Sequence, residues 1–245
     1  MSFSSWRGTV GLVRPTLRPG VLDELIRLLP EGVNIQPTML NTQTGTVDEF
    51  RSGIHAYEPK IAEVAKLDVD VINPSGAPPF MILGHTGERE LLKTWETKYG
   101  VPFFTSGTTT IDALNALRVK RFVGVTYFPG AEDNQIYGKY YSDAGFKVME
   151  MAGMNVPFKT VQELSSRLVY SFAKKAFLRN KGAQALYLLG AAWRTLDIIQ
   201  LLEDDLEVPV IQATAAQAWD IQRHLTVRAP QSGYGRLLRD LPKTA

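Results

Sequence analysis

The sequence predicts an α/β fold of two pseudo-symmetric lobes, each a mostly parallel sheet flanked by helices, with the site in the cleft between them. Short apolar runs alternate with segments of helical pattern along all 245 residues, which is typical of parallel strands joined by right-handed crossovers. Two of the runs, 68–73 and 184–189, lead into turns of small residues whose glycines, Gly76 and Gly190, stand close to half the chain apart. Open α/β sheets bind ligands at the carboxyl ends of their strands, so the two turns predict a shared pocket.

In the first half, strand-length apolar runs predict strands and a helical spacing of apolar residues predicts helices. The expected strands are 8–13, 33–39, 68–73 and 101–104, and the expected helices are 21–29, 47–67, 86–99 and 111–117. Pro15 and Pro19 exclude a helix directly after the first strand. Pro37 marks the end of a strand or an edge, and Pro59 predicts that the helix over 47–67 kinks or restarts.

The second half repeats the alternation. The expected strands are 121–126, 147–151, 184–189 and 208–211, and the expected helices are 132–144, 160–178, 196–203 and 214–224. The long helix is expected to begin at Thr160, because Thr160 and Glu163 have the spacing of a capping box. We expect an N-terminal lobe over 1–117 and a C-terminal lobe over 118–211, with 212–245 packing back on the first lobe. The tail from Thr226 could instead contact a second subunit of a homo-oligomer or stay loose.

The composition excludes several classes of function. The net charge is only +2 and basic residues are dispersed among acidic ones, so no nucleic-acid surface is expected. No apolar run approaches the roughly 18 residues of a membrane span, and a cytoplasmic protein without a membrane partner is expected. The chain has no cysteine, which excludes disulfides and thiolate ligands. The three histidines lack metal-binding spacing, and no glycine-rich phosphate loop is present, so neither a metal nor a cofactor is expected.

The turns at the strand ends are rich in Ser, Thr, Asn and Gly. Their hydroxyl and backbone N–H groups could hold a carboxylate, although ordinary helix capping explains the same composition. Basic side chains in or beside the turns either pair with an acidic substrate or form surface or interlobe salt bridges: Arg14, Arg18 and Arg194. Tyr127 and Asn134 follow the mid-chain strand, where Asn134 equally suits a helix cap. His85 is close enough to the first turn to reach the pocket, or it caps the next helix.

Several of these pieces resemble the aspartate/glutamate racemase superfamily, especially its arylmalonate decarboxylase and maleate cis-trans isomerase branch. The matching motifs span most of the chain in the family's order: GLVRPT at 11–16, DVINPSG at 70–76, ALNALRVKR at 113–121, VTY at 125–127, and LLG at 188–190 followed by Arg194 and Thr195. The resemblance implies a cysteine in one or both turns, yet those positions fall on Gly76 and Gly190. Arg18 stands near a position where the family has asparagine.

The resemblance implies a carboxylate pocket that also stabilises an enediolate. Its expected donors are Thr16, Ser75, Gly76, Ala77, Tyr127, Gly190 and Ala191, with Asn73, Asn134, Arg14, Arg18 and Arg194 as further substrate-binding residues. Tyr127, Ser75 and His85 are the catalytic candidates. The resulting expectation is a cofactor-independent lyase that decarboxylates a small carboxylate. A cis-trans isomerase or racemase of a small dicarboxylate, a hydrolase or hydratase using activated water, and an inactive carboxylate-binding protein are the alternatives.

Overall fold

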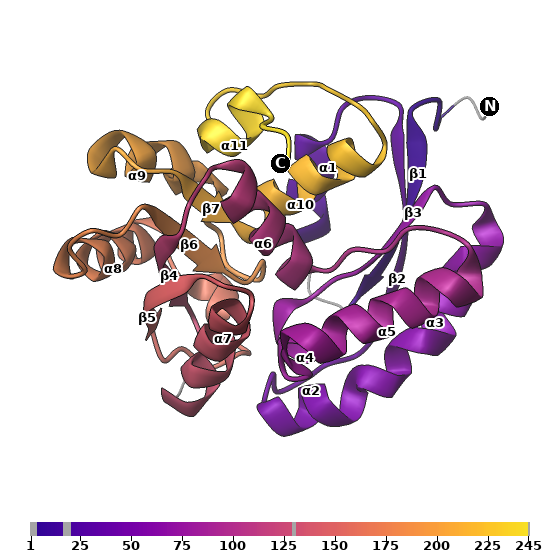
Figure 1. Ribbon diagram of the computed structural model, residues 1–245, viewed down its shortest axis with the longest axis horizontal. Helices are drawn as coiled ribbons and strands as arrows, with labels where there is room; N and C mark the ends of the chain where they lie inside the picture. Colours follow the sequence, from indigo (N-terminus) through magenta and orange to yellow (C-terminus); the bar gives the residue numbers. More distant parts are fainter. Residues whose placement is uncertain (1–3, 17–20, 129–130, 245) are drawn as a thin grey trace.

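A computed structural model describes residues 4–16, 21–128 and 131–244. It contains two separate parallel sheets, ordered β2-β1-β3 and β5-β4-β6-β7, with helices packed around them (Figure 1). The strands are β1 (Gly8–Arg14), β2 (Val33–Met39), β3 (Val71–Pro74), β4 (Arg121–Thr126), β5 (Lys147–Gly153), β6 (Ala185–Leu189) and β7 (Val210–Gln212). The α/β fold with two parallel sheets is therefore confirmed.

The helices lie in the connections between strands and after the last strand. They are α1 (Val21–Leu28), α2 (Val47–Gly53), α3 (Tyr57–Val64), α4 (Ala77–Met81), α5 (Gly84–Tyr99), α6 (Ser106–Ala116), α7 (Ala131–Asp143), α8 (Ser166–Arg179), α9 (Ile199–Leu206), α10 (Ala213–His224) and α11 (Gly235–Asp240). Single 3₁₀ turns add Ile54–Ala56, Ala65–Leu67, Val161–Glu163 and Leu196–Ile198. No helix of the described ranges combines the length and apolarity needed to cross a membrane.

Several expected elements differ from the structure. The strand expected over 101–104 is wrong, because in the described chain this segment joins the sheet only through an isolated bridge between Phe103 and Ile72. The proline-rich turn instead holds α4, since prolines fit the first turn of a helix. The expected capping box at Thr160 is wrong, and α8 begins after the N-cap Ser165, whose hydroxyl accepts from the Leu168 N–H. The helix expected from 111 begins earlier, at Ser106.

Pro59 lies where the helix expected over 47–67 restarts, which is one of the two outcomes that the sequence predicted. The segment 47–67 divides into α2, a 3₁₀ turn and α3, and Pro59 lies in the first turn of α3. A proline is tolerated there because the first amide groups of a helix have no intrahelical acceptor. The restart places Phe50 on α2 and Tyr57 on α3 in two different buried environments.

Helix α10 joins the two halves. It packs against α1 and α6 of the first half as well as against β7 (Figure 1). The Thr109 hydroxyl of α6 donates to Asp220 of α10 at 2.6 Å, in a fully buried contact. Beyond α10, the Gln231 amide donates to the Leu28 carbonyl at 2.6 Å, and α11 packs on α9 and β7. The C-terminal segment thus contacts both halves.

Candidate active site

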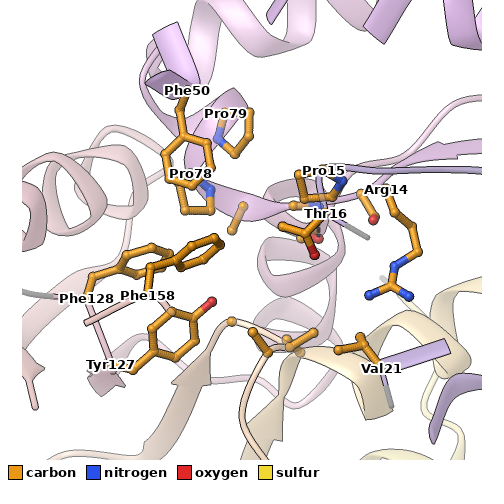
Figure 2. A pocket seen from close by; sticks show the side chains of 18 of the residues that line it. Arg14, Pro15, Thr16, Val21, Phe50, Pro78, Pro79, Tyr127, Phe128 and Phe158 are labelled. Carbon is orange, nitrogen blue, oxygen red and sulfur yellow. Dashed lines mark hydrogen bonds between the residues drawn. The ribbon is translucent and has the colours of Figure 1, made fainter. Parts of the chain in front are cut away.

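A cavity of about 70 Å³ lies where the carboxyl ends of strands from the two sheets face each other (Figure 2). Its wall is built mainly from the residues that directly follow β1, β3, β4 and β6. The first half contributes Arg14, Pro15, Thr16, Val21, Phe50, Ser75, Gly76, Ala77, Pro78, Pro79 and Ser106; the second half contributes Tyr127, Phe128, Phe158, Gly190, Ala191, Ala192, Ala213 and Gln217. Each half of the chain therefore supplies part of one site.

The turn after β3 is fixed by its backbone. The Ser75 N–H donates to the Val13 carbonyl at 2.8 Å, and the Ser75 carbonyl accepts from the Tyr57 hydroxyl at 2.9 Å. Gly76 has φ +101°, and a Cβ there would lie 2.9 Å from a Pro15 side-chain carbon. The Gly76 N–H donates to the Ser106 hydroxyl at 3.2 Å. The Gly76 amide is therefore already paired, while the Ser75 side chain stands in the cavity wall.

The turn after β6 packs closely against the side chain of Tyr127. Gly190 has φ +97°, and a Cβ at this position would lie 2.6 Å from a Tyr127 ring carbon and 3.0 Å from its hydroxyl oxygen. The Gly190 carbonyl accepts from the Trp193 indole N–H at 2.7 Å, and the Trp193 ring packs edge-on against Tyr127 at 5.3 Å. The phenol therefore occupies the space that a side chain at position 190 would need. Figure 2 shows its hydroxyl directed into the cavity.

One wall of the cavity is apolar. The rings of Phe50, Phe128 and Phe158 form a cluster with centroid separations of 6.2 to 6.4 Å. Pro78 and Pro79 extend this surface (Figure 2). A group bound against these side chains loses water without gaining a charged partner.

The opposite wall is polar and carries Arg14 and Thr16 (Figure 2). Arg14 is only 6% exposed, and its Nη1 atom is buried without a hydrogen-bond partner. Burial lowers the pKa of the guanidinium, and the charge of Asp23 partly offsets that effect. Among the described residues that line the cavity, Arg14 alone has a charged side chain. The site therefore has a positive polar end and a neutral apolar end.

Several residues expected at the site lie in or beside this cavity, and others do not. Asn73 is buried behind the wall, where its amide donates to the Phe104 carbonyl at 2.7 Å and accepts from Gln217 at 2.5 Å. Asn134 does not line the cavity, although its buried Oδ1 has no hydrogen-bond partner. Arg194 lines a neighbouring depression beside α1. Arg18 lies outside the described residues.

The expectation that His85 reaches the pocket is wrong. Helix α5 begins at Gly84 and carries His85 to a separate surface depression with Arg89 and Asp112. Its ring packs edge-on against Tyr140 at 5.8 Å. His85 is therefore not placed to exchange a proton with a molecule in the cavity.

Sequence reasoning missed several residues of the cavity wall, among them Phe50, Ser106, Phe158 and Gln217. Ser106 stands in a Ser/Thr-rich turn after a short apolar run, the same signal that pointed to Ser75. Gln217 lies within a helix and is directed by its hydrogen bond to Asn73, a contact between distant parts of the sequence. Phe50 and Phe158 gave no local signal, because an aromatic residue in a helix or loop usually serves the core.

The turn that carries Ser106 is braced by a buried carboxyl group. Thr105 caps α6 and its hydroxyl donates to Glu88 at 2.6 Å, and the Tyr140 hydroxyl also donates to Glu88. Burial raises the pKa of Glu88 to about 7, and the two hydrogen bonds limit the rise. Glu88 on α5 thereby links the cap of α6 to α7 of the second half.

Glu88 is expected to make stability fall as pH rises from about 4.5 to 7. Over this window the folded state binds the proton that the unfolded chain has released, so the slope of unfolding free energy with pH is negative. The full effect is about 3 kcal/mol. In urea denaturation at pH 5 and pH 8, Glu88→Gln should remove most of this difference. Glu90→Gln, an exposed change on the same helix, should leave it intact; equal pH dependence in all three proteins would contradict the assignment.

The family model for arylmalonate decarboxylase matches residues 10–238. The chain belongs to the arylmalonate decarboxylase family. The resemblance expected from the motifs is confirmed, and this family member keeps the cavity between its two sheets without a cysteine in either turn. A search of curated protein sequences finds no match.

Solved structures share the fold of this arylmalonate decarboxylase family member. A double mutant of arylmalonate decarboxylase in the liganded form is 20% identical with a TM-score of 0.89, covering 95% of this chain and 99% of that one. The maleate isomerase Iso from Pseudomonas putida S16 is 20% identical with a TM-score of 0.87, covering 96% and 99%. A Nocardia farcinica maleate cis-trans isomerase mutant with a covalently bound succinylcysteine intermediate is 21% identical with a TM-score of 0.81, covering 95% and 98%.

Proposed function

We propose that the protein is a cofactor-independent decarboxylase of a small carboxylate that carries an apolar substituent, acting through an enediolate. The observation that carries the proposal is the division of one cavity into a polar wall with Arg14 and Thr16 and an aromatic wall with Phe128 and Phe158. Membership in the arylmalonate decarboxylase family supports the same chemistry.

The two walls suit opposite ends of a decarboxylation. The leaving carboxylate loses its charge as it becomes carbon dioxide, so an apolar wall favours the change. The electron pair of the broken C–C bond passes into the retained carboxylate, where it forms an enediolate with additional negative charge. The hydroxyls of Ser75 and Thr16, together with the backbone N–H of Ala191, can donate to these oxygens, and preorganised donors are the largest rate contribution in such reactions.

The enediolate carbon must then receive a proton. The Tyr127 hydroxyl is directed into the cavity beside Gly190, the position where the family resemblance places a thiol. In the proposed step this phenol gives its proton to carbon, and water restores it. Delivery from one side would make the product of a prochiral substrate a single enantiomer.

Isomerisation by thiol addition fits the chain less well. The Nocardia farcinica isomerase mutant named above carries a succinylcysteine intermediate, whereas this chain has no cysteine. A double-bond isomerisation would need another nucleophile, and the hydroxyl of Ser75 has no histidine partner among the described cavity residues. Decarboxylation requires no nucleophile and is the better match.

Proton NMR of the purified protein in D₂O with a panel of 2-substituted malonates and maleate tests the proposal. The expected result is loss of one carboxylate with one deuterium at the α-carbon of an arylmalonate. Maleate converted to fumarate would favour the isomerase, and solvent ¹⁸O in a product would favour hydrolysis or hydration. Ligand-induced thermal stabilisation without turnover of any compound would leave a carboxylate-binding protein and overturn the proposal.

A further inference from the structure

Arg14 is a buried cation that forms no ion pair within 4 Å with another described residue, although the charge of Asp23 acts on it from a greater distance. The residue is only 6% exposed, and its Nη1 has no hydrogen-bond partner. A buried charge is strongly unfavourable unless it is paired, and a guanidinium cannot escape by losing its proton. A protein that keeps such a group in a cavity wall gains stability when an anion occupies the cavity.

The backbone of Arg14 is held at a defined place beside that cavity. Arg14 is the last residue of β1, the central strand of its sheet, and its carbonyl accepts from the Leu40 N–H at 2.7 Å. Figure 2 shows the side chain on the far side of the cavity from Phe128 and Phe158, with Thr16 between it and the aromatic cluster. The backbone therefore places Arg14 on the polar side of the cavity, away from the aromatic cluster.

We propose that Arg14 anchors the carboxylate that is retained, and thereby decides which of two carboxylates the substrate loses. The inference rests on the proposed function. The described residues give the cavity wall a single cation, and such a wall treats two chemically equal carboxylates differently. The carboxylate paired with Arg14 is stabilised as an anion and accepts the electron pair of the breaking bond, while the unpaired one, against Phe128 and Phe158, leaves as neutral carbon dioxide. Arg14 is a specificity-determining residue in this scheme.

Binding of a substrate-sized monoanion tests whether Arg14 holds a carboxylate, and it needs no catalytic turnover. Phenylacetate and its neutral analogue phenylacetamide are titrated calorimetrically into the wild-type protein, Arg14→Met, Arg14→Lys and Arg167→Met, an exposed charge-matched control on α8. The wild-type protein should prefer the carboxylate by about 10–100-fold, the range of a charge-assisted hydrogen bond. Arg14→Met should lose that preference, Arg14→Lys should keep part of it, and the control should keep all of it. An unchanged preference in Arg14→Met overturns the inference.

A desymmetrised substrate tests the choice of leaving group. One enantiomer of 2-methyl-2-phenylmalonate with ¹³C in a single carboxyl group is incubated with each protein, and the label is followed in carbon dioxide and in product. The wild-type protein should place the label in one of the two only, and Arg14→Met should divide it between both. An undivided label in an active Arg14→Met variant overturns the inference.

The calorimetric and the labelling experiments together distinguish a failure of the Arg14 inference from a failure of the proposed function. If the wild-type protein releases no carbon dioxide from any malonate, the proposed function fails, and the calorimetric comparison still judges Arg14 as an anion anchor. If carbon dioxide is released but Arg14→Met behaves as the wild type in both arms, the function stands and the anchor is wrong. Arg14→Lys keeps the calorimetric test available if the methionine variant does not fold.

Discussion

Replacing Tyr127 with phenylalanine is expected to lower kcat for decarboxylation by about 10²–10⁴-fold, the usual contribution of a positioned side chain that transfers a proton in the transition state. The ring contacts with Phe128 and Trp193 do not involve the hydroxyl, at 4.5 and 5.3 Å between centroids. The fold should therefore survive with little change in melting temperature. Steady-state kinetics and thermal denaturation of the same preparation measure both quantities.

Tyr187→Phe is the matched control for Tyr127→Phe. Tyr187 is fully buried on β6 and does not line the cavity, so its hydroxyl should have no effect on kcat. The enantiomeric excess of the product gives a second readout, because a residual reaction of Tyr127→Phe that takes its proton directly from water should give a lower value. Full activity and an unchanged enantiomeric excess in Tyr127→Phe would remove this phenol from the mechanism.

Gly190→Ala is expected to lower the free energy of unfolding by about 2–5 kcal/mol and to abolish most of the activity. The added Cβ would lie 2.6 Å from the Tyr127 ring at a backbone φ of +97°. A left-handed non-glycine residue costs roughly 1–2 kcal/mol and overpacking a further 1–3 kcal/mol. Gly190→Cys should behave in the same way, since the new thiol can enter only where the phenol now lies. Denaturant unfolding and kcat measure the two effects.

Gly145→Ala separates backbone strain from steric overlap. Gly145 has a similar φ of +93°, but a Cβ there would meet nothing within 4 Å. This variant should show the strain alone and retain full activity. If Gly190→Ala and Gly145→Ala lose equal stability and both remain active, Tyr127 is not confined by Gly190 and the arrangement of the second turn is wrong.

The sequence could predict the elements whose signal is local. The apolar run before Gly190 ends where β6 ends, because a glycine with positive φ stops the strand and starts the turn. Pro59 marked the restart at α3 for the equally local reason that its ring and missing N–H fit only the first helical turn. The two turns, and with them Ser75, Ala77 and Ala191 in the cavity wall, follow from such signals.

Elements that depend on distant contacts could not be predicted in this way. The Thr160 spacing suits a capping box, yet Ser165 caps α8 in the structure. The orientation of His85 depends on where α5 packs, which its own segment does not encode. Gln217 reaches the cavity wall through Asn73, 144 residues earlier. Arg14 was recognisable as a basic residue in a turn, but its burial without an ion-pair partner required the folded chain.

The position of α10 determines when the cavity can be completed during synthesis of the chain. The cavity begins at Arg14, and Ala213 and Gln217 on α10 complete it. On a ribosome, where chains fold from the N-terminus onward, any folding of the first sheet before these last residues emerge takes place without a complete cavity. A ligand stabilises only a state that can bind it, so no substrate can assist that early folding. Until α10 emerges, the cavity that would bind the substrate stays incomplete.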